Sequence, residues 1–153
     1  MLNKPKEVEL TRAVIYKEYV DLLWNAKDAI VLNLKDNESG LIKIKTKKID
    51  NFIEILVLDN ALGVDKDILN KIFEPYFTTK HKYQGTGLGL YMTRKIINSS
   101  MGGEISVQNK KFTHNKKEYK GAEFKIKIPL KLDWLWLKVC DIILSYNLKF
   151  LIK

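Results

Sequence analysis

Cysteine and histidine are scarce in this sequence of 153 residues, which has one cysteine, Cys140, and two histidines. A single thiol excludes an internal disulfide framework and a cysteine metal cluster. The sequence also lacks the apolar core of a signal peptide at its start, and it has no stretch of about 20 uncharged apolar residues that could span a bilayer. These absences predict a domain of the cytoplasm, where thiols stay reduced.

Acidic residues are outnumbered by basic ones, 18 against 27, which gives a formal net charge of +9. The excess is mostly lysine and is spread along the chain instead of being concentrated in one block. Solvated surface charge is one interpretation of this distribution, and a basic patch for an anionic ligand is the other. No zinc-finger spacing and no basic stripe interleaved with aromatics occurs, so nothing favours a nucleic-acid partner.

Apolar residues make up 46% of the chain, enough for one core, and they follow helical and strand periods in alternation. The spacing predicts a helix over residues 9–31 and two paired strands over 41–48 and 52–59. Further along, it predicts a short helix capped by Asp65 and stopped by Pro75, a loop over 76–86, a helix over 90–100, and a hairpin of strands 102–109 and 122–129 joined by a basic loop over 110–120. This order predicts an α/β fold with helices on one face of a sheet.

Three glycines at alternate positions, Gly85, Gly87 and Gly89, stand in the segment QGTGLGL. Such a run costs backbone entropy, so a close approach of the backbone to a phosphate is a natural interpretation. The dinucleotide fingerprint needs a glycine where Leu90 stands, and a P-loop needs a Gly-Lys-Ser/Thr tripeptide that the chain lacks. Neither familiar phosphate loop therefore fits, and the neighbouring segments have to identify the site.

Two polar residues stand where the pattern predicts a buried environment. Asp59 ends the apolar strand 52–59, where a carboxylate is costly unless it receives hydrogen bonds, and Gly63 soon after it would let a flat ring approach. Asn25 lies within the apolar first helix, with Asp21 and Asp28 on the same side. Taken alone, the Asp-Asn-x-x-Gly pattern at Asp59 is usually just a turn, and an asparagine such as Asn25 in an apolar helix is more often a core amide with satisfied hydrogen bonds than a ligand.

Four segments in order resemble the sequence boxes of one family: LLWNAKDA (22–29), LDNALGV (58–64), IFEPYFTTK (72–80) and GTGLGLYMTRKII (85–97). They are similar to the N box, the first glycine box, the F box and the second glycine box of the ATP-binding catalytic domain of bacterial sensor histidine kinases. The wider superfamily includes gyrase, chaperone and mismatch-repair ATPases. The resemblance extends over about residues 19–130. It implies a two-layer α/β sandwich, a mixed sheet with helices on one face, known as the Bergerat-type ATP-binding fold.

The resemblance also implies ATP and Mg²⁺ as ligands and assigns roles to residues. Asp59 would accept a hydrogen bond from the adenine amino group, Asn25 would ligate Mg²⁺, and the glycines would bring N–H groups to the phosphates at a helix start. Asn25, Asp21 and Lys80 are the catalytic candidates. The predicted nucleotide-binding residues are Asn25, Asp28, Asp59, Ala61, Gly63, Val64, Phe73, Thr79, Lys80, Gly85, Thr86, Gly87, Leu88, Gly89 and Leu90.

Two positions depart from the family pattern. Ala61 stands where the family most often has the first glycine of the Asp-Asn-Gly-x-Gly pattern in the first glycine box, a small change with which we still expect nucleotide binding. Asp21 stands where the kinases carry Asn or His, whereas the ATPase and serine-kinase branches carry a Glu there as general base. Asp21 is therefore interpreted either as a drifted asparagine position or as a base.

The resemblance favours transfer of the γ-phosphoryl group of ATP to a histidine on another domain or chain, with a response regulator as an indirect partner. A serine kinase or slow ATPase using Asp21 and a non-catalytic nucleotide-binding module stay open as alternatives. The family's histidine-bearing helical hairpin has no counterpart before residue 19, so we expect a standalone domain, a truncated form or a gene fragment. His81 and His114 lie outside any such helix, and we expect neither to be the acceptor.

The last 23 residues differ in composition from residues 1–130, which we interpret as the catalytic domain, and we treat 131–153 as a separate apolar tail. Over 134–152 the polar residues fall on one narrow stripe of a predicted helix: Lys138, Asp141, Ser145 and Lys149. The broad apolar face that remains would be covered by the domain, by a protein partner or by a membrane surface.

Overall fold

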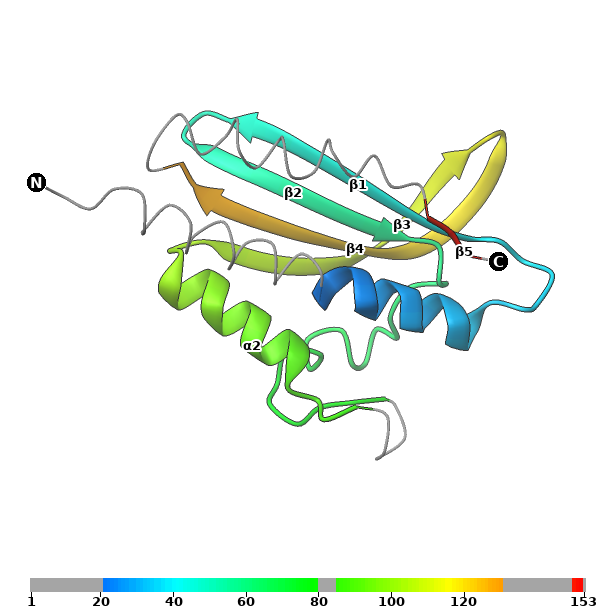
Figure 1. Cartoon of the computed structure of the whole chain (residues 1–153), viewed down its shortest axis with the longest axis horizontal. Helices are drawn as coiled ribbons and strands as arrows, with labels where there is room; N and C mark the ends of the chain where they lie inside the picture. The colour runs from blue at the N-terminus through cyan, green and yellow to red at the C-terminus, as the bar shows by residue number, and fades with distance from the viewer. Residues whose placement is uncertain (1–20, 80–84, 131–149, 153) are drawn as a thin grey trace, which may run out of the picture.

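The computed structural model describes residues 21–79, 85–130 and 150–152, and its strands form one sheet with helices against one face (Figure 1). The order across the sheet is β3-β4-β2-β1-β5. The strands are β1 (Gly40–Ile49), β2 (Phe52–Asp59), β3 (Glu104–His114), β4 (Lys117–Pro129) and β5 (Phe150–Ile152). The predicted two-layer α/β arrangement is confirmed.

Every strand pairing within the described residues is antiparallel, whereas a mixed sheet was predicted. Strands β1 and β2 are joined by a tight turn, as are β3 and β4, and such short connections allow only antiparallel neighbours. The two hairpins then join through β2 and β4, which pair from Phe52 opposite Pro129 to Leu58 opposite Glu123. This central pairing brings residues about 65 positions apart into contact beside Asp59.

Two helical segments cover the face of the sheet that carries the core (Figure 1). The first helix is described over residues 21–33, and the part of its prediction before residue 21 lies outside the described residues. The second segment consists of α2 (Gly89–Lys95) and one π-helical turn, η1 (Ile96–Ser100), which confirms the helix predicted over 90–100. Among the residues that the structure describes, no helix is long and apolar enough to cross a membrane.

The core lies between these helices and alternate residues of the strands. Its most deeply buried apolar members, at most 2% exposed, include Leu22 and Ala26 of the first helix, Ile42 of β1, Ile53, Ile55 and Val57 of β2, Ile97 of η1, and Ile126 of β4. Because side chains alternate along a strand, the residues between these positions face the opposite side of the sheet. Asp59, at the end of β2, therefore lies on the same helix-covered face as Ile53, Ile55 and Val57.

The helix predicted after Asp65 is not formed, and residues 66–73 are a series of turns instead. The amide of Asp67 donates to the Asp65 carboxylate at 3.0 Å, as a cap would, but the next backbone bonds are mostly of the tighter three-residue type. A single turn gains little from helix propagation, and Pro75 disfavours helical backbone in the residue before it. Burial of Ile72 and Phe73 holds the turns against the core.

The prediction of a basic loop over 110–120 is also wrong, because β3 and β4 continue through these residues to a two-residue turn. Asn115 and Lys116 both have positive φ, 49° and 64°, which is the backbone of a type I′ hairpin turn. Phe112 and Tyr119 lie opposite each other and stack with ring centroids 5.7 Å apart. This aromatic pair stabilises a ribbon that charge patterning alone had suggested was a loop.

The helix predicted over 134–152 does not extend to its last three residues, which form β5 and pair with Gly40–Ile42 of β1. Residues 134–149 lie outside the described residues. The order of strands places β5 at the edge of the sheet.

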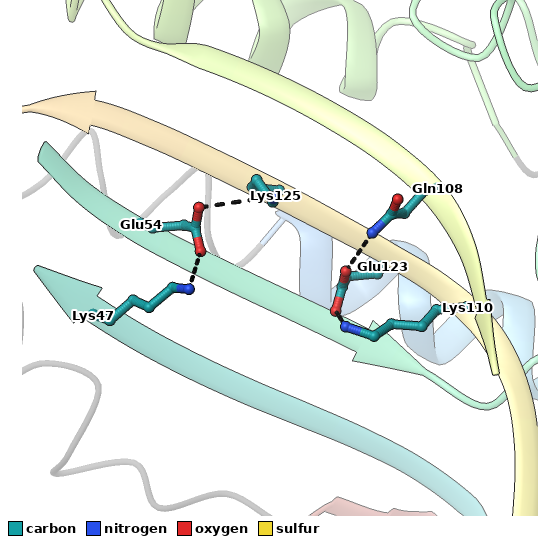
Figure 2. A network of polar contacts seen from close by, with 6 residues as sticks. All are labelled: Lys47, Glu54, Gln108, Lys110, Glu123 and Lys125. Atoms are coloured by element: carbon teal, nitrogen blue, oxygen red, sulfur yellow. Dashed lines mark hydrogen bonds and ion pairs between the residues drawn. The ribbon is translucent and has the colours of Figure 1, made fainter. Parts of the chain in front are cut away.

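The face of the sheet opposite the helices carries two buried carboxylates held by lysines (Figure 2). Glu54 is bridged by Lys47 at 3.0 Å and by Lys125 at 3.8 Å. Glu123 accepts hydrogen bonds from Gln108 and Lys110. Burial raises the pKa of Glu123, but the hydrogen bonds and the charge of Lys110 outweigh this effect and leave its pKa below the ordinary value.

Candidate functional site

A pocket of about 670 Å³ opens on the helix-covered side, between the first helix, the segment after β2 and the glycine-rich segment before α2. Ala122 and Phe124 of β4 form part of its lining. Most of the predicted nucleotide-binding residues line it: Asn25, Asp59, Ala61, Gly63, Val64, Thr79, Gly85, Thr86, Gly87, Gly89 and Leu90. Segments separated by up to about 100 positions in the sequence thus contribute to one cavity.

The structure does not place every predicted residue at the pocket. Asp28 and Leu88 do not line it, and Lys80 lies outside the described residues. Phe73 is buried in the core, where its ring meets Phe124 edge-on at 6.4 Å, so it supports the pocket from behind. Asp21 does not line the pocket either, and no observation therefore favours its use as a base.

Asp59 lines the pocket and is only 2% exposed. Its Oδ1 accepts the amide of Ala61 at 2.9 Å and the amide of Ala122 at 3.1 Å. Within the described residues no donor reaches Oδ2, so this oxygen is the acceptor that the carboxylate presents to the cavity. Burial raises the pKa of Asp59 above its ordinary value by more than the two amides lower it.

The segment that follows Asp59 is held in place by two asparagines. Asn60 is buried and bonds the backbone at the start of β1, accepting from Leu41 N at 2.8 Å and donating to the O of Ser39, just before the strand, at 3.0 Å. Asn109 of β3 accepts from Val64 N at 2.7 Å and donates to Val64 O at 2.6 Å. These contacts fix the backbone that forms one wall of the pocket.

Two of the residues that build this wall were missed by sequence reasoning, namely Asn109 and Gly121. A Cβ at Gly121 would lie 1.7 Å from the carbonyl oxygen of Asp59, so only glycine lets β4 pass this close. A glycine inside a strand pattern is the available signal for such an approach. Asn109 gave no comparable signal, because an asparagine at the end of a strand is common in turns.

Gly87 and Gly89, which also line the pocket, serve different purposes. Gly87 has φ of 68°, and a Cβ there would lie 2.4 Å from the carbonyl carbon of Tyr76, so the fold itself requires glycine. A Cβ at Gly89 would meet no atom of the described residues within 4 Å, so the space beside it is open. Gly89 begins α2, whose N-cap residue, Leu88, provides no side-chain hydrogen bond to the first amides. Within the described residues, no N-cap side chain bonds these amides, which makes them candidates for contact with an anion.

Asn25 is the one polar side chain of the first helix for which a metal role was predicted. Its Nδ2 donates to the carbonyl oxygen of Asp21 at 2.9 Å, one turn earlier. This bond orients the amide so that Oδ1, which no described donor reaches, is available at the pocket. The part of the chain that the structure describes contains no cluster of three His, Cys, Asp or Glu side chains able to hold a metal by themselves.

The chain resembles known proteins over most of its length. Residues 17–132 match the family of histidine kinase-, DNA gyrase B- and HSP90-like ATPases. The sequence is 34% identical over 113 residues (72% of the chain) to the two-component sensor PprA of Pseudomonas aeruginosa. It is 35% identical over 101 residues (65% of the chain) to the signal transduction histidine-protein kinase AtoS of Escherichia coli.

The chain spans only 11% and 15% of the lengths of these two proteins. Among solved structures, the catalytic domain of histidine kinase ThkA matches with a TM-score of 0.57 and 30% identity, covering 76% of this chain and 66% of that one. The fold, the pocket and the family match therefore agree: the chain belongs to the histidine kinase-, DNA gyrase B- and HSP90-like ATPase family and is an ATP-binding catalytic domain of the sensor histidine kinase type.

Proposed function

We propose that the pocket binds ATP with Mg²⁺ and that the domain transfers the γ-phosphoryl group to a histidine supplied by another domain or chain. One observation carries the nucleotide assignment: Asp59 is a buried carboxylate that lines the pocket, and one of its oxygens receives no donor from the described residues. A buried acceptor of this kind costs stability unless a ligand donates to it. The proposed reaction is supported by the similarity to AtoS, which is named a signal transduction histidine-protein kinase, and to PprA, which is named a two-component sensor.

Asp59 would recognise the base through its Oδ2. Adenine offers an amino group at the position where guanine carries a carbonyl oxygen, so an ionised carboxylate attracts the first and repels the second. Ala61 and Val64, which line the same end, would contact the faces of the ring. The predicted specificity is therefore for adenine.

The phosphates would lie at the other end, against the glycine-rich segment. Gly89 leaves open space beside the pocket, and the amides at the start of α2 have no side-chain cap. Backbone N–H groups at a helix start attract anions. Lys80 is proposed to add a positive charge there.

The metal would be held by the phosphates and by one protein oxygen, Oδ1 of Asn25. An amide oxygen suits Mg²⁺, which keeps several waters and takes few protein ligands. When bound, Mg²⁺ neutralises charge on the phosphates. The part played by Asn25 is to present its oxygen in a fixed direction, which the bond from Nδ2 to Asp21 provides.

The acceptor histidine is proposed to come from a separate domain, with a response regulator as the indirect partner. His114 ends β3 beside the hairpin turn and does not line the pocket. Phosphoryl transfer needs the acceptor within about 3–3.5 Å of the reacting phosphorus and in line with it. Positioning and charge neutralisation would carry the reaction without a covalent intermediate on this chain. Its place would be the cytoplasm, where ATP is supplied.

Incubation of the purified chain with γ-labelled ATP and Mg²⁺, with and without the histidine-bearing domain of a related sensor kinase, tests this proposal. Acid-labile, base-stable label is expected on the added domain and absent from this chain. Release of free phosphate without transfer would instead indicate an ATPase. Stoichiometric label on His81 or His114 would overturn transfer to another domain or chain, and failure to bind ATP would overturn the proposal as a whole.

A further inference from the structure

Asn109 is the side chain outside the predicted site that makes the most specific contact with it. It lies on β3, 45 positions from Val64, and forms two hydrogen bonds with the backbone of that one residue, at 2.7 and 2.6 Å. A side-chain amide that pairs with both the N–H and the C=O of one residue fixes its position and its orientation. Val64 lines the pocket, so the contact bears directly on the site.

Asn109 also leaves no room for a side chain at Gly63, the residue before Val64. Gly63 has φ of 83°, and a Cβ there would lie 2.4 Å from Oδ1 of Asn109. The amide of Leu62 in turn donates to Lys120 O at 3.0 Å on β4. Three successive residues of the wall are thus held against the β3–β4 hairpin.

The hairpin holds the other end of this segment through the cross-strand partner of Asn109. Asn109 lies opposite Ala122 in the β3–β4 register. The amide of Ala122 donates to Oδ1 of Asp59 at 3.1 Å. One cross-strand pair therefore positions both the carboxylate and the wall that faces it.

We infer that Asn109 is a positioning residue for the base end of the nucleotide pocket, acting through the Val64 peptide. This inference rests on the proposed function, since it assigns Asn109 a role in nucleotide affinity. Asn109 does not line the pocket, so its effect is on the shape of the wall and not on contact with the ligand. Ligands that use the base end depend on Asn109, and ligands that use only the phosphate end do not.

The test compares Asn109→Ala with Asn109→Asp, which keeps an acceptor for Val64 N but loses the donor to Val64 O. Ser106→Ala is the matched control, an exposed residue of the same strand whose side chain faces away from the pocket. Hydrogen exchange at the Val64 amide and the affinities for ATP, adenosine and inorganic triphosphate are measured at a temperature well below unfolding. A merely structural role would not change the ratio of adenosine to triphosphate affinity.

We expect Asn109→Ala to speed hydrogen exchange at the Val64 amide and to lower the affinities for ATP and adenosine about tenfold. The affinity for inorganic triphosphate should change less than about twofold. Asn109→Asp should lie between the wild type and Asn109→Ala. Faster exchange at Val64 with unchanged adenosine and ATP affinity would overturn the inference alone. A wild-type chain that binds triphosphate but neither adenosine nor ATP would overturn the proposed function and the inference with it.

Discussion

Two carboxylates buried on opposite faces of the sheet, Asp59 and Glu123, differ in how their charge is compensated. On the face opposite the helices, which we call the outer face, Glu123 has both oxygens bonded, one to Gln108 and one to Lys110 (Figure 2). On the helix-covered face, Asp59 receives two amides on a single oxygen. Burial dominates the pKa of Asp59 and raises it, whereas the partners of Glu123 reverse the effect of burial and lower its pKa.

This difference separates a structural charge from a candidate ligand-binding charge. A buried polar group with complete hydrogen bonding is a normal part of a fold. A buried carboxylate that keeps one oxygen for a cavity lowers stability and is expected where a ligand completes its hydrogen bonding. The four predictions that follow test this comparison.

The largest expected effect comes from closing the space around Asp59. Gly121→Ala would place a methyl group 1.7 Å from the Asp59 carbonyl oxygen, which requires β4 to move away from β2. We expect a loss of about 3 kcal/mol or more in the free energy of unfolding, measured by urea denaturation. Gly89→Ala is the matched control, because a Cβ there meets nothing within 4 Å and stability should be unchanged or slightly higher. Equal stability of the two variants would contradict the close approach at Gly121.

Asp59→Asn should weaken ATP binding while leaving the stability of the fold nearly unchanged. Asn keeps an oxygen for the two amides but turns a donor toward the adenine amino group, so ATP affinity should fall about ten- to a hundredfold. The affinity for GTP should fall less, because the amide N–H of the new side chain can donate to the carbonyl oxygen of guanine. The free energy of unfolding should stay within about 1 kcal/mol of the wild type, since a costly buried charge is removed. Titration with both nucleotides checks this, and equal affinities in all four pairings would exclude an adenine site.

Glu123→Gln should lower stability and leave ATP affinity unchanged, the reverse of what is expected for Asp59→Asn. It removes the ion pair with Lys110, and because that lysine side chain is 43% exposed, we expect a loss of only about 1–2 kcal/mol in the free energy of unfolding. ATP affinity should not change, since Glu123 faces away from the pocket. The same urea and nucleotide titrations measure both quantities. A loss of affinity comparable to that of Asp59→Asn would show that the outer face acts on the site.

The smallest expected effect is a pH dependence of opposite sign for the two carboxylates. The raised pKa of Asp59 means that its contribution to stability is present below pH 3.8 and is lost as the pH rises through its folded pKa. The lowered pKa of Glu123 means that its contribution is present above pH 4.5 and is lost as the pH falls through its folded pKa.

Unfolding measured from acid to neutral pH for the wild type, Asp59→Asn and Glu123→Gln checks these signs. Relative to the wild type, Asp59→Asn should become more stable as the pH rises, and Glu123→Gln should become less stable. Parallel curves for the three proteins would mean that neither carboxylate titrates differently in the folded and unfolded states.

The sequence alone predicted the elements whose patterns are local. The strand 52–59 has the bounds of β2, and the helix predicted over 90–100 differs from the observed helical segment by one residue. Asp59, Gly63 and the glycine-rich segment were identified as parts of one site because the order of the boxes along the chain is itself a sequence property. Patterns failed where cross-strand packing decided the structure, as in the ribbon held by Phe112 and Tyr119.

Only the tertiary structure decided which residues hold the base end of the pocket. Asn109 bonds a residue 45 positions away, and the amide of Ala122 reaches a carboxylate 63 positions away. Gly121 is required by a backbone that passes it from another hairpin. Sequence periodicity reports on neighbours within a helix or strand, whereas these contacts depend on how β2, β3 and β4 are aligned side by side. The alignment is set by burial of the common core, and no single segment of the chain contains that information.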